Sequence, residues 1–278
     1  MRHPATSPRF VLLGTGTCQL QAHRRASSVL LELGNLRIVY DFGRGIADRL
    51  AALGLRQDDV SHVVLSHFHP DHVSDLVPYL HAASWSRIDA RTRDLHLWGP
   101  RGIEVQMARI LGLFGPDELT RRAWRVHVHE VREPTLTIED HRFDWRELPP
   151  SGNHGLRFEH QGRVVALTGD SGFHDAEVEF LADVDLAIFD SGHLTDDEIV
   201  ELAVRSRARR LVASHVYREL DTEALVARAR ARGFSGELLL GADGMAFALD
   251  DLESRPRVLT SRLDNSRLEE THLAEGRA

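Results

Sequence analysis

One short segment of the sequence concentrates residue types that bind metals. The run H-F-H-P-D-H (67–72) places three imidazoles and one carboxylate within six residues. Zinc and other borderline divalent cations take this ligand set. A single metal needs three or four ligands. Consecutive residues point in different directions, so the Asp71-His72 pair is expected to point differently from His67 and His69. The spacing therefore favours a site for two metal ions.

Other candidate ligands follow the predicted ends of further buried strands. His154, Asp170 and His215 all have this placement. Each is weak evidence alone, because an isolated histidine after a strand is more often a surface or hydrogen-bonded core residue. Asp170, within G-D-S-G (169–172), also fits a simple turn. They remain candidates because a loop that follows a strand and carries ligands is a common way to build a site.

The elements that must position these residues alternate between strands and helices. Apolar runs and turn signals such as Gly34-Asn35 and Gln161-Gly162 predict strands, and apolar residues at helical spacing predict helices. Strands are expected at 10–13, 28–33, 36–40, 60–66, 95–98, 125–131, 135–138, 141–148, 156–159, 163–168, 184–189, 210–213 and 237–240, and helices at 46–55, 73–85, 103–114, 196–206 and 222–233. Two similar halves of this kind predict two packed sheets with helices outside.

The same patterns suggest one main domain. We expect residues 1–9 to be a flexible N-terminus, 10–249 to be the domain, and 250–278 to be a polar tail without periodicity.

Composition excludes several classes of protein. The chain has 278 residues and a formal charge of -8, and because it contains no lysine all 34 basic residues are arginine. Schiff-base chemistry and phosphate binding by a P-loop lysine are excluded, and a strongly cationic nucleic-acid surface is not indicated. Cys18 is the only cysteine, so a cysteine zinc cluster is excluded. Neither a secretory signal nor an apolar span of about 20 residues is present, so we expect a cytoplasmic protein without a membrane partner.

The ordered motifs resemble those of the metallo-beta-lactamase superfamily. The resemblance spans about residues 10 to 249 and rests on G-T-G-T (14–17), Y-D-F-G (40–43), H-F-H-P-D-H (67–72), G-N-H-G (152–155), T-G-D-S-G (168–172) and S-H (214–215). It implies an α/β fold, a four-layer αββα sandwich with a dinuclear metal centre along one edge. It also implies two divalent ions, zinc first, with manganese or iron equally suited to these ligands.

Carried over by position, the resemblance implies a complete ligand set. His67, His69 and His154 would hold the first metal, Asp71, His72 and His215 the second, and Asp170 would bridge them. A hydroxide held between the metals and oriented by Asp170 would be the nucleophile, which makes Asp71 and Asp170 catalytic as well as structural.

Within the superfamily, G-H-L-T (192–195) ahead of a helix resembles the ribonuclease Z and small-phosphodiesterase branch. His193 would then protonate the leaving group, supported by Asp190. Histidine suits this task because it titrates near neutral pH. The alternative is that His193 only begins the helix.

Two departures bear on the substrate. Members that process tRNA carry a long Gly- and Pro-rich arm between the third and fourth motifs, whereas a short hairpin joins His154 to Asp170 here. Several lactone-cleaving members place a tyrosine just after the bridging aspartate, where this chain has Phe173. We therefore expect a phosphodiesterase acting on a small or short nucleotide-type substrate. A lactonase or other acyl hydrolase is the alternative, ahead of a tRNA 3′-end endonuclease or a non-catalytic metal-binding scaffold.

The remaining expectations concern partners and unassigned side chains. A stable nucleic-acid complex is not expected, and a homodimer is implied by the resemblance alone. His127 and His129 alternate along a predicted strand and are expected on its solvent face, while His62 is expected to pack beside the site strand. Arg218 could meet a substrate phosphate, although a surface ion pair is the preferred interpretation.

Overall fold

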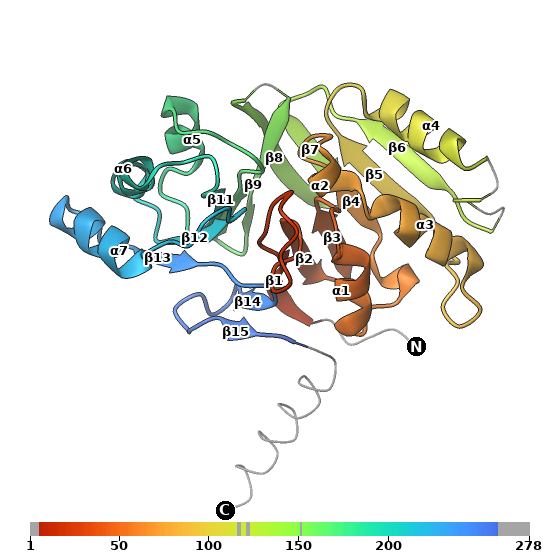
Figure 1. Ribbon diagram of the computed structural model, residues 1–278, viewed down its shortest axis with the longest axis horizontal. Helices are drawn as coiled ribbons and strands as arrows, with labels where there is room; N and C mark the ends of the chain where they lie inside the picture. Colours follow the sequence, from red (N-terminus) through yellow and green to blue (C-terminus); the bar gives the residue numbers. More distant parts are fainter. Residues whose placement is uncertain (1–5, 116–117, 121–122, 151, 261–278) are drawn as a thin grey trace, which may run out of the picture.

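The computed structural model describes residues 6–115, 118–120, 123–150 and 152–260. These residues form two β-sheets that pack face to face, with helices on both outer sides (Figure 1). The expected αββα sandwich is confirmed.

The first sheet has eight strands, and its consecutive members β3 to β6 run parallel. The turn between β2 and β3 contains Gly34 at a φ of 65°, which suits a glycine in a tight hairpin. In spatial order the strands are β15 (Arg257–Val258), β14 (Met245–Ala248), β1 (Thr6–Gly14), β2 (Ser28–Gly34), β3 (Leu36–Tyr40), β4 (His62–Val64), β5 (Leu95–Gly99) and β6 (Val126–Glu130).

The second sheet has seven strands, of which β10 to β13 run parallel. The strands β9 and β10 form the hairpin expected around Gln161-Gly162. In spatial order the strands are β13 (Glu237–Leu240), β12 (Arg210–Ser214), β11 (Leu186–Asp190), β10 (Arg163–Leu167), β9 (Asn153–His160), β8 (His141–Leu148) and β7 (Thr135–Ile138).

Three hydrophobic clusters hold the four layers together. One fills the space between the sheets, and the other two lie between each sheet and its helices. The first sheet is covered by α1 (Ile46–Ala52), α3 (Leu76–Trp85) and α4 (Ile103–Leu113), and the second by α5 (Asp175–Phe180), α6 (Asp196–Ser206) and α7 (Thr222–Ala231) (Figure 1). A capping box between Thr195 and Glu198 fixes the start of α6.

The parallel strands bring the chemically important loops to one edge. β3 is followed by Asp41, β4 by the 67–72 segment, β10 by Asp170 and β12 by His215, while β11 ends at Asp190. Within each sheet the parallel strands share the direction of their carboxyl ends. The contacts of Asp170 with His72 and His215 show that these ends of the two sheets meet at the same edge of the sandwich.

Several elements differ from the sequence predictions. The helix expected at 73–85 is two helices, α2 (Pro70–Val73) and α3, because the chain turns at 74–75. The elements α5, β14 and β15 were not predicted, since each has at most six residues and is too short to show a period. Ordered strands extend beyond 10–249 at both ends, from Thr6 to Val258. The other residues of the expected N-terminus and tail, 1–5 and 261–278, lie outside the described residues.

The placement of His127 and His129 is a further difference. Both lie on β6 in line with His96 and Trp98 of β5, on the face that carries Trp98 toward the inter-sheet core. Both side chains are half-buried, so they are neither open to solvent, as expected of a solvent face, nor enclosed in the core. His62 is buried beside the site strand, as expected. Among the described residues, no helix has the length and apolar character needed to cross a bilayer.

Candidate metal centre

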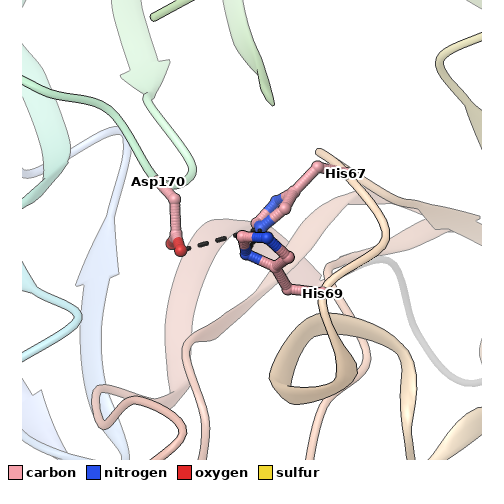
Figure 2. A group of neighbouring side chains, drawn as sticks. All are labelled: His67, His69 and Asp170. Carbon is pink, nitrogen blue, oxygen red and sulfur yellow. Dashed lines mark hydrogen bonds and ion pairs between the residues drawn. The ribbon is translucent and has the colours of Figure 1, made fainter. Parts of the chain in front are cut away.

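The loop after β4 presents the first group of ligand atoms. His67 follows the strand and is buried, and His69 is the residue before α2, with Pro70 as the first residue of that helix. The Nε2 of His67 lies 2.9 Å from the Nδ1 of His69 and 3.7 Å from the Oδ2 of Asp170. Figure 2 shows Asp170 approaching this histidine pair from the opposite sheet. These three side chains therefore form one group that could hold a metal.

A second group of ligand atoms lies next to the first, on the other side of Asp170. Asp71 and His72 come from the start of α2, and His215 follows β12 of the other sheet. The Nε2 of His215 lies 3.6 Å from the Oδ2 of Asp71 and 3.4 Å from the Oδ1 of Asp170, and the Nε2 of His72 lies 3.0 Å from that same Asp170 oxygen. Asp170 thus turns one oxygen toward each group, which is the arrangement expected of a bridging carboxylate.

The donor atoms of this region fit bound cations. Within the described part of the chain, His72 Nε2, His215 Nε2 and Asp170 Oδ1 are buried and face one another at 3.0 and 3.4 Å, but none of them makes a hydrogen bond of good geometry. Buried polar atoms are normally paired, and leaving one unpaired costs about 1–3 kcal/mol. Three such atoms around one point, offered by two imidazoles and a carboxylate, match the ligands of zinc.

The backbone of His154 lies close to the loop that carries His67, but its ring does not join either group of ligand atoms. Its main-chain N–H donates to the carbonyl oxygen of Ser66, 3.0 Å away, next to His67. Its ring stacks on Trp145 at a centroid distance of 4.8 Å, and its Nδ1–H donates to the Gly152 carbonyl. The structure therefore does not bring this predicted ligand into either group, and its metal role stays a prediction.

Asp41 supports the second group through a hydrogen bond to His72. This carboxylate is buried and accepts hydrogen bonds from the backbone N–H and hydroxyl of Ser66 at 2.7 and 2.8 Å and from His72 Nδ1 at 2.8 Å. A carboxylate on the far nitrogen fixes the tautomer and orientation of a metal-binding imidazole. Sequence reasoning quoted Asp41 within Y-D-F-G but assigned it no role.

Asp190 links His215 of the second group to a further histidine. Its Oδ2 lies 2.6 Å from His193 Nδ1, and its Oδ1 lies 3.2 Å from His215 Nδ1. The rings of His193 and His215 stack at 5.2 Å, and Tyr217 meets both rings edge-on. One carboxylate therefore orients both imidazoles. The predicted association of Asp190 with His193 is present, whereas Tyr217 was not singled out from the sequence.

Charge balance in the centre favours cation binding. Burial alone would lower the pKa of His72, but the carboxylates of Asp41 and Asp170 outweigh it and hold that pKa well above its usual range. Burial would raise the pKa of Asp170, but the imidazoles of His72, His215 and His67 lower it instead. Burial, together with the charge of His72, lowers the pKa of His67 to about 4. A cation at His72 would therefore compete with a proton.

The remaining two imidazoles carry raised pKa values. Burial would lower the pKa of His215, but its bonds with Asp190 and Asp71 raise it to about 9. The hydrogen bond with Asp190 raises the pKa of His193 against the smaller effect of burial.

A cleft of about 880 Å³ opens over the first group. Its lining includes His67, His69, His154, Asp170 and His193 of the candidate site. The other lining residues are Phe68, Pro100, Arg101, Val131, Arg132, Glu133, Pro134, Trp145, Glu147, Pro150, Gly152 and Asn153. Arg218, by contrast, donates to the carbonyl oxygen of Leu194 and pairs with Asp196 at 2.7 Å, which agrees with the preferred interpretation of a surface ion pair.

A family model and the sequences of known proteins both relate this chain to one superfamily. The family model of the metallo-beta-lactamase superfamily matches residues 23–215. A ribonuclease Z of Mycobacterium sp. (strain KMS) is 31% identical over 218 residues, which cover 73% of this chain and 74% of the relative.

Solved structures share the fold. Human tRNase Z, short form, has a TM-score of 0.68 at 21% identity, with 87% of this chain and 99% of that chain covered. A diphosphatase from the PhnP family has a TM-score of 0.64 at 20% identity, with 86% and 97% covered. With the family model matched across both halves of the ligand set, the chain belongs to the metallo-beta-lactamase superfamily and is a hydrolase of that superfamily.

Proposed function

We propose that this hydrolase is a phosphodiesterase that acts on small or nucleotide-type phosphodiesters with two bound divalent ions, zinc first. The position of His193 carries the proposal. Its ring lines the cleft, 41% of its side chain is exposed, and its Nδ1 is bonded to Asp190. An alkoxide leaving group needs a proton, and an oriented imidazole beside the centre can deliver one.

The ligand roles follow the two groups of side chains. Asp71, His72 and His215 would hold one ion, His67 and His69 the other, and Asp170 would bridge them. His154 would complete the first set once its ring leaves the stack on Trp145. When bound, the ions would supply Lewis acidity at the phosphoryl oxygens and lower the pKa of a water molecule.

The protein's own side chains divide the remaining work. Asp190 accepts from His193 Nδ1 and so leaves Nε2 as the atom that gives its proton to the departing oxygen. As the bond between phosphorus and that oxygen breaks, the proton neutralises the alkoxide. Asp41 holds His72 in its tautomer, so this ligand of the second group is oriented before substrate arrives. We assign Asp71 and Asp170 as catalytic residues through the centre that they hold in place.

The cleft supports a substrate with an anionic and a flat part. Arg101 and Arg132 line it and are exposed, although Arg132 also pairs with Glu130 at 2.8 Å. Phe68 and the largely buried Trp145, on which His154 stacks, add aromatic lining. A phosphate with an attached base or aryl group suits such walls.

Cleavage at the end of an RNA is the second candidate. It is favoured by the relatives named ribonuclease Z, at 31% identity. The short β9–β10 hairpin, which occupies the position of the long arm expected for tRNA processing, favours smaller substrates. The acidic net charge of -8 acts in the same direction.

The test is hydrolysis of a simple aryl phosphodiester by protein loaded with a measured amount of zinc or manganese. A lactone and a short RNA serve as competing substrates. We expect metal-dependent phosphodiester turnover that is lost in Asp71→Ala and kept in Asp140→Ala, a control at an exposed carboxylate on the β7–β8 turn. Lactone turnover without phosphodiester turnover would refute the proposal in favour of acyl hydrolysis, and cleavage of RNA alone would establish the second candidate.

A further inference from the structure

A second concentration of histidines lies on the inner face of β4, β5 and β6, at the end of the molecule opposite α7 (Figure 1). We call it the histidine face; it consists of His62, His96, His127 and His129. The strand register pairs His62 with His96 and His96 with His127, so three imidazoles form a row across three parallel strands. His129 lies two residues beyond His127 on the same face of β6.

Two of the three separations among His96, His127 and His129 fall within the range found in the main centre. The centroid of His96 lies 4.9 Å from that of His127 and 5.2 Å from that of His129, and the latter two are 6.5 Å apart. In the main centre, neighbouring rings are 4.5 Å apart for His67 and His69 and 5.6 Å apart for His72 and His215.

Two nitrogens of the histidine face already converge. His96 Nδ1 lies 2.9 Å from His129 Nε2, the same separation that joins His67 to His69. Two nitrogens on one tetrahedral zinc, with Zn–N near 2.0–2.1 Å, are roughly 3.3 Å apart. An ion between His96 and His129 therefore requires the two nitrogens to separate by about 0.4 Å, and both rings to turn so that their lone pairs point at the ion in place of the present hydrogen bond.

The surrounding groups orient these imidazoles. Asp94 Oδ2 lies 2.7 Å from His127 Nε2, which leaves Nδ1 of that ring as the free ligand atom. A carboxylate on the far nitrogen is the usual partner of a metal-bound histidine. Trp98 stacks on His129 at 3.9 Å and donates its indole N–H to His62 Nδ1.

We propose that His96, His127 and His129 form a separate site for one borderline divalent cation such as zinc. His96 and His129 already place two nitrogens together, and His127 has to move to supply the third, which gives the number that holds zinc in carbonic anhydrase. His127 joins by turning its half-exposed ring toward the other two, with Asp94 as its partner. The partial exposure of all three rings gives a hydrated ion access to the site.

The protonation of the face suits this role. Burial and the neighbouring imidazoles lower the pKa of His96 and of His129, so both are neutral in neutral solution and their lone pairs are available. His62, whose pKa burial lowers to about 4, stays neutral beneath them.

The experiment counts metal per chain after equilibrium dialysis of the full protein, without an added histidine tag, against zinc. We expect three equivalents in the parent protein and two in the double variant His96→Gln/His129→Gln. His81→Gln, an exposed histidine of α3, should keep three. Equal zinc content in the parent and the double variant would overturn the proposal, because the face would then hold only hydrogen-bonded imidazoles.

A gentler variant covers the case in which the double variant does not fold. Asp94→Asn leaves every ring in place and should weaken the third equivalent by about 10–100-fold while the other two are unaffected. An unchanged affinity for that equivalent would contradict the assigned role of Asp94 and of His127. The same variants should keep the turnover of the main centre, so the outcome is independent of the proposed function.

Discussion

At the scale of single residues, the site depends on hydrogen bonds that fix the conformation of its side chains. Asp41 and His215 both follow strands with φ values of 60° and 52°, in the left-handed region that non-glycine residues rarely occupy. Such conformations persist only where surrounding contacts enforce them, and they occur often at functional sites. Here the hydrogen bonds of Asp41 to Ser66 and His72, and that of His215 to Asp190, provide those contacts.

Replacing His193 by alanine separates chemistry from metal binding. His193→Ala should keep both metals and lose turnover by about 10²–10⁴-fold, the usual contribution of a general acid. Metal content and the steady-state rate on an aryl phosphodiester measure the two effects, with His81→Ala as the control. Full activity in the variant would remove His193 from the mechanism. Loss of one metal would instead make it a ligand, which its closeness to Asp170 and His215 also permits.

The residue types of the site were predictable, but their side-chain positions were not. The H-F-H-P-D-H spacing identifies ligands because no other common role needs three imidazoles and a carboxylate there. Ring orientation depends on neighbours far away in the sequence, such as Trp145 under His154. The sequence places His127 and His129 on one face of a strand, but a two-residue period does not say which face is covered by the rest of the protein.

At the scale of elements, long periodic segments were predictable and short ones were not. The hairpins and the helices α4, α6 and α7 show clear periods and end signals, so their positions follow from local sequence. The six-residue helix α5 has no such signal, and it is held by packing of Val178 and Phe180 against the second sheet. The same helix carries Glu177, which is fully buried.

Glu177 should make stability depend on pH. Burial raises its pKa to about 8, against the ordinary 4.5, although the Ser171 hydroxyl donates to its Oε1. Between these values the folded protein holds a proton that the unfolded chain releases. Its contribution is therefore complete below pH 4.5 and is lost as pH rises toward 8, by up to about 1.4 kcal/mol per pH unit.

Urea unfolding of Glu177→Gln across this pH range tests the effect. Because glutamine does not titrate, the variant should lose less stability than the parent as pH rises. Glu179→Gln, an exposed neighbour on α5, should follow the parent. Parallel curves for Glu177→Gln and the parent would show that the carboxyl is ionised in the folded state.

At the scale of the whole molecule, the segment after 249 belongs to the packed structure as far as it is described. Leu252 and Leu259 are buried, and the guanidinium of the buried Arg49 donates to the carbonyl oxygens of Leu259 and Thr260. Residues 250–260 therefore close one end of the first sheet.

Truncation tests the domain boundary. A chain of residues 1–249 should lose several kcal/mol of unfolding free energy, because burial of each leucine contributes about 1.5–3 kcal/mol and Arg49 would be left unpaired. A chain ending at Thr260 keeps every contact that the structure describes and should stay within about 1 kcal/mol of the full chain. Urea unfolding measures both, and equal stability of the 1–249 chain would place the domain boundary at 249.

The bridging position of Asp170 joins two regions of the chain that are otherwise separate. His67, His69, Asp71 and His72 come from the first sheet, whereas Asp170 and His215 come from the second. Under the proposed ligand roles, neither half alone supplies a full set of ligands, so bound ions would link the two sheets. Metal release would then favour separation of the sheets, and the thermal midpoint would rise with the concentration of free zinc around the protein.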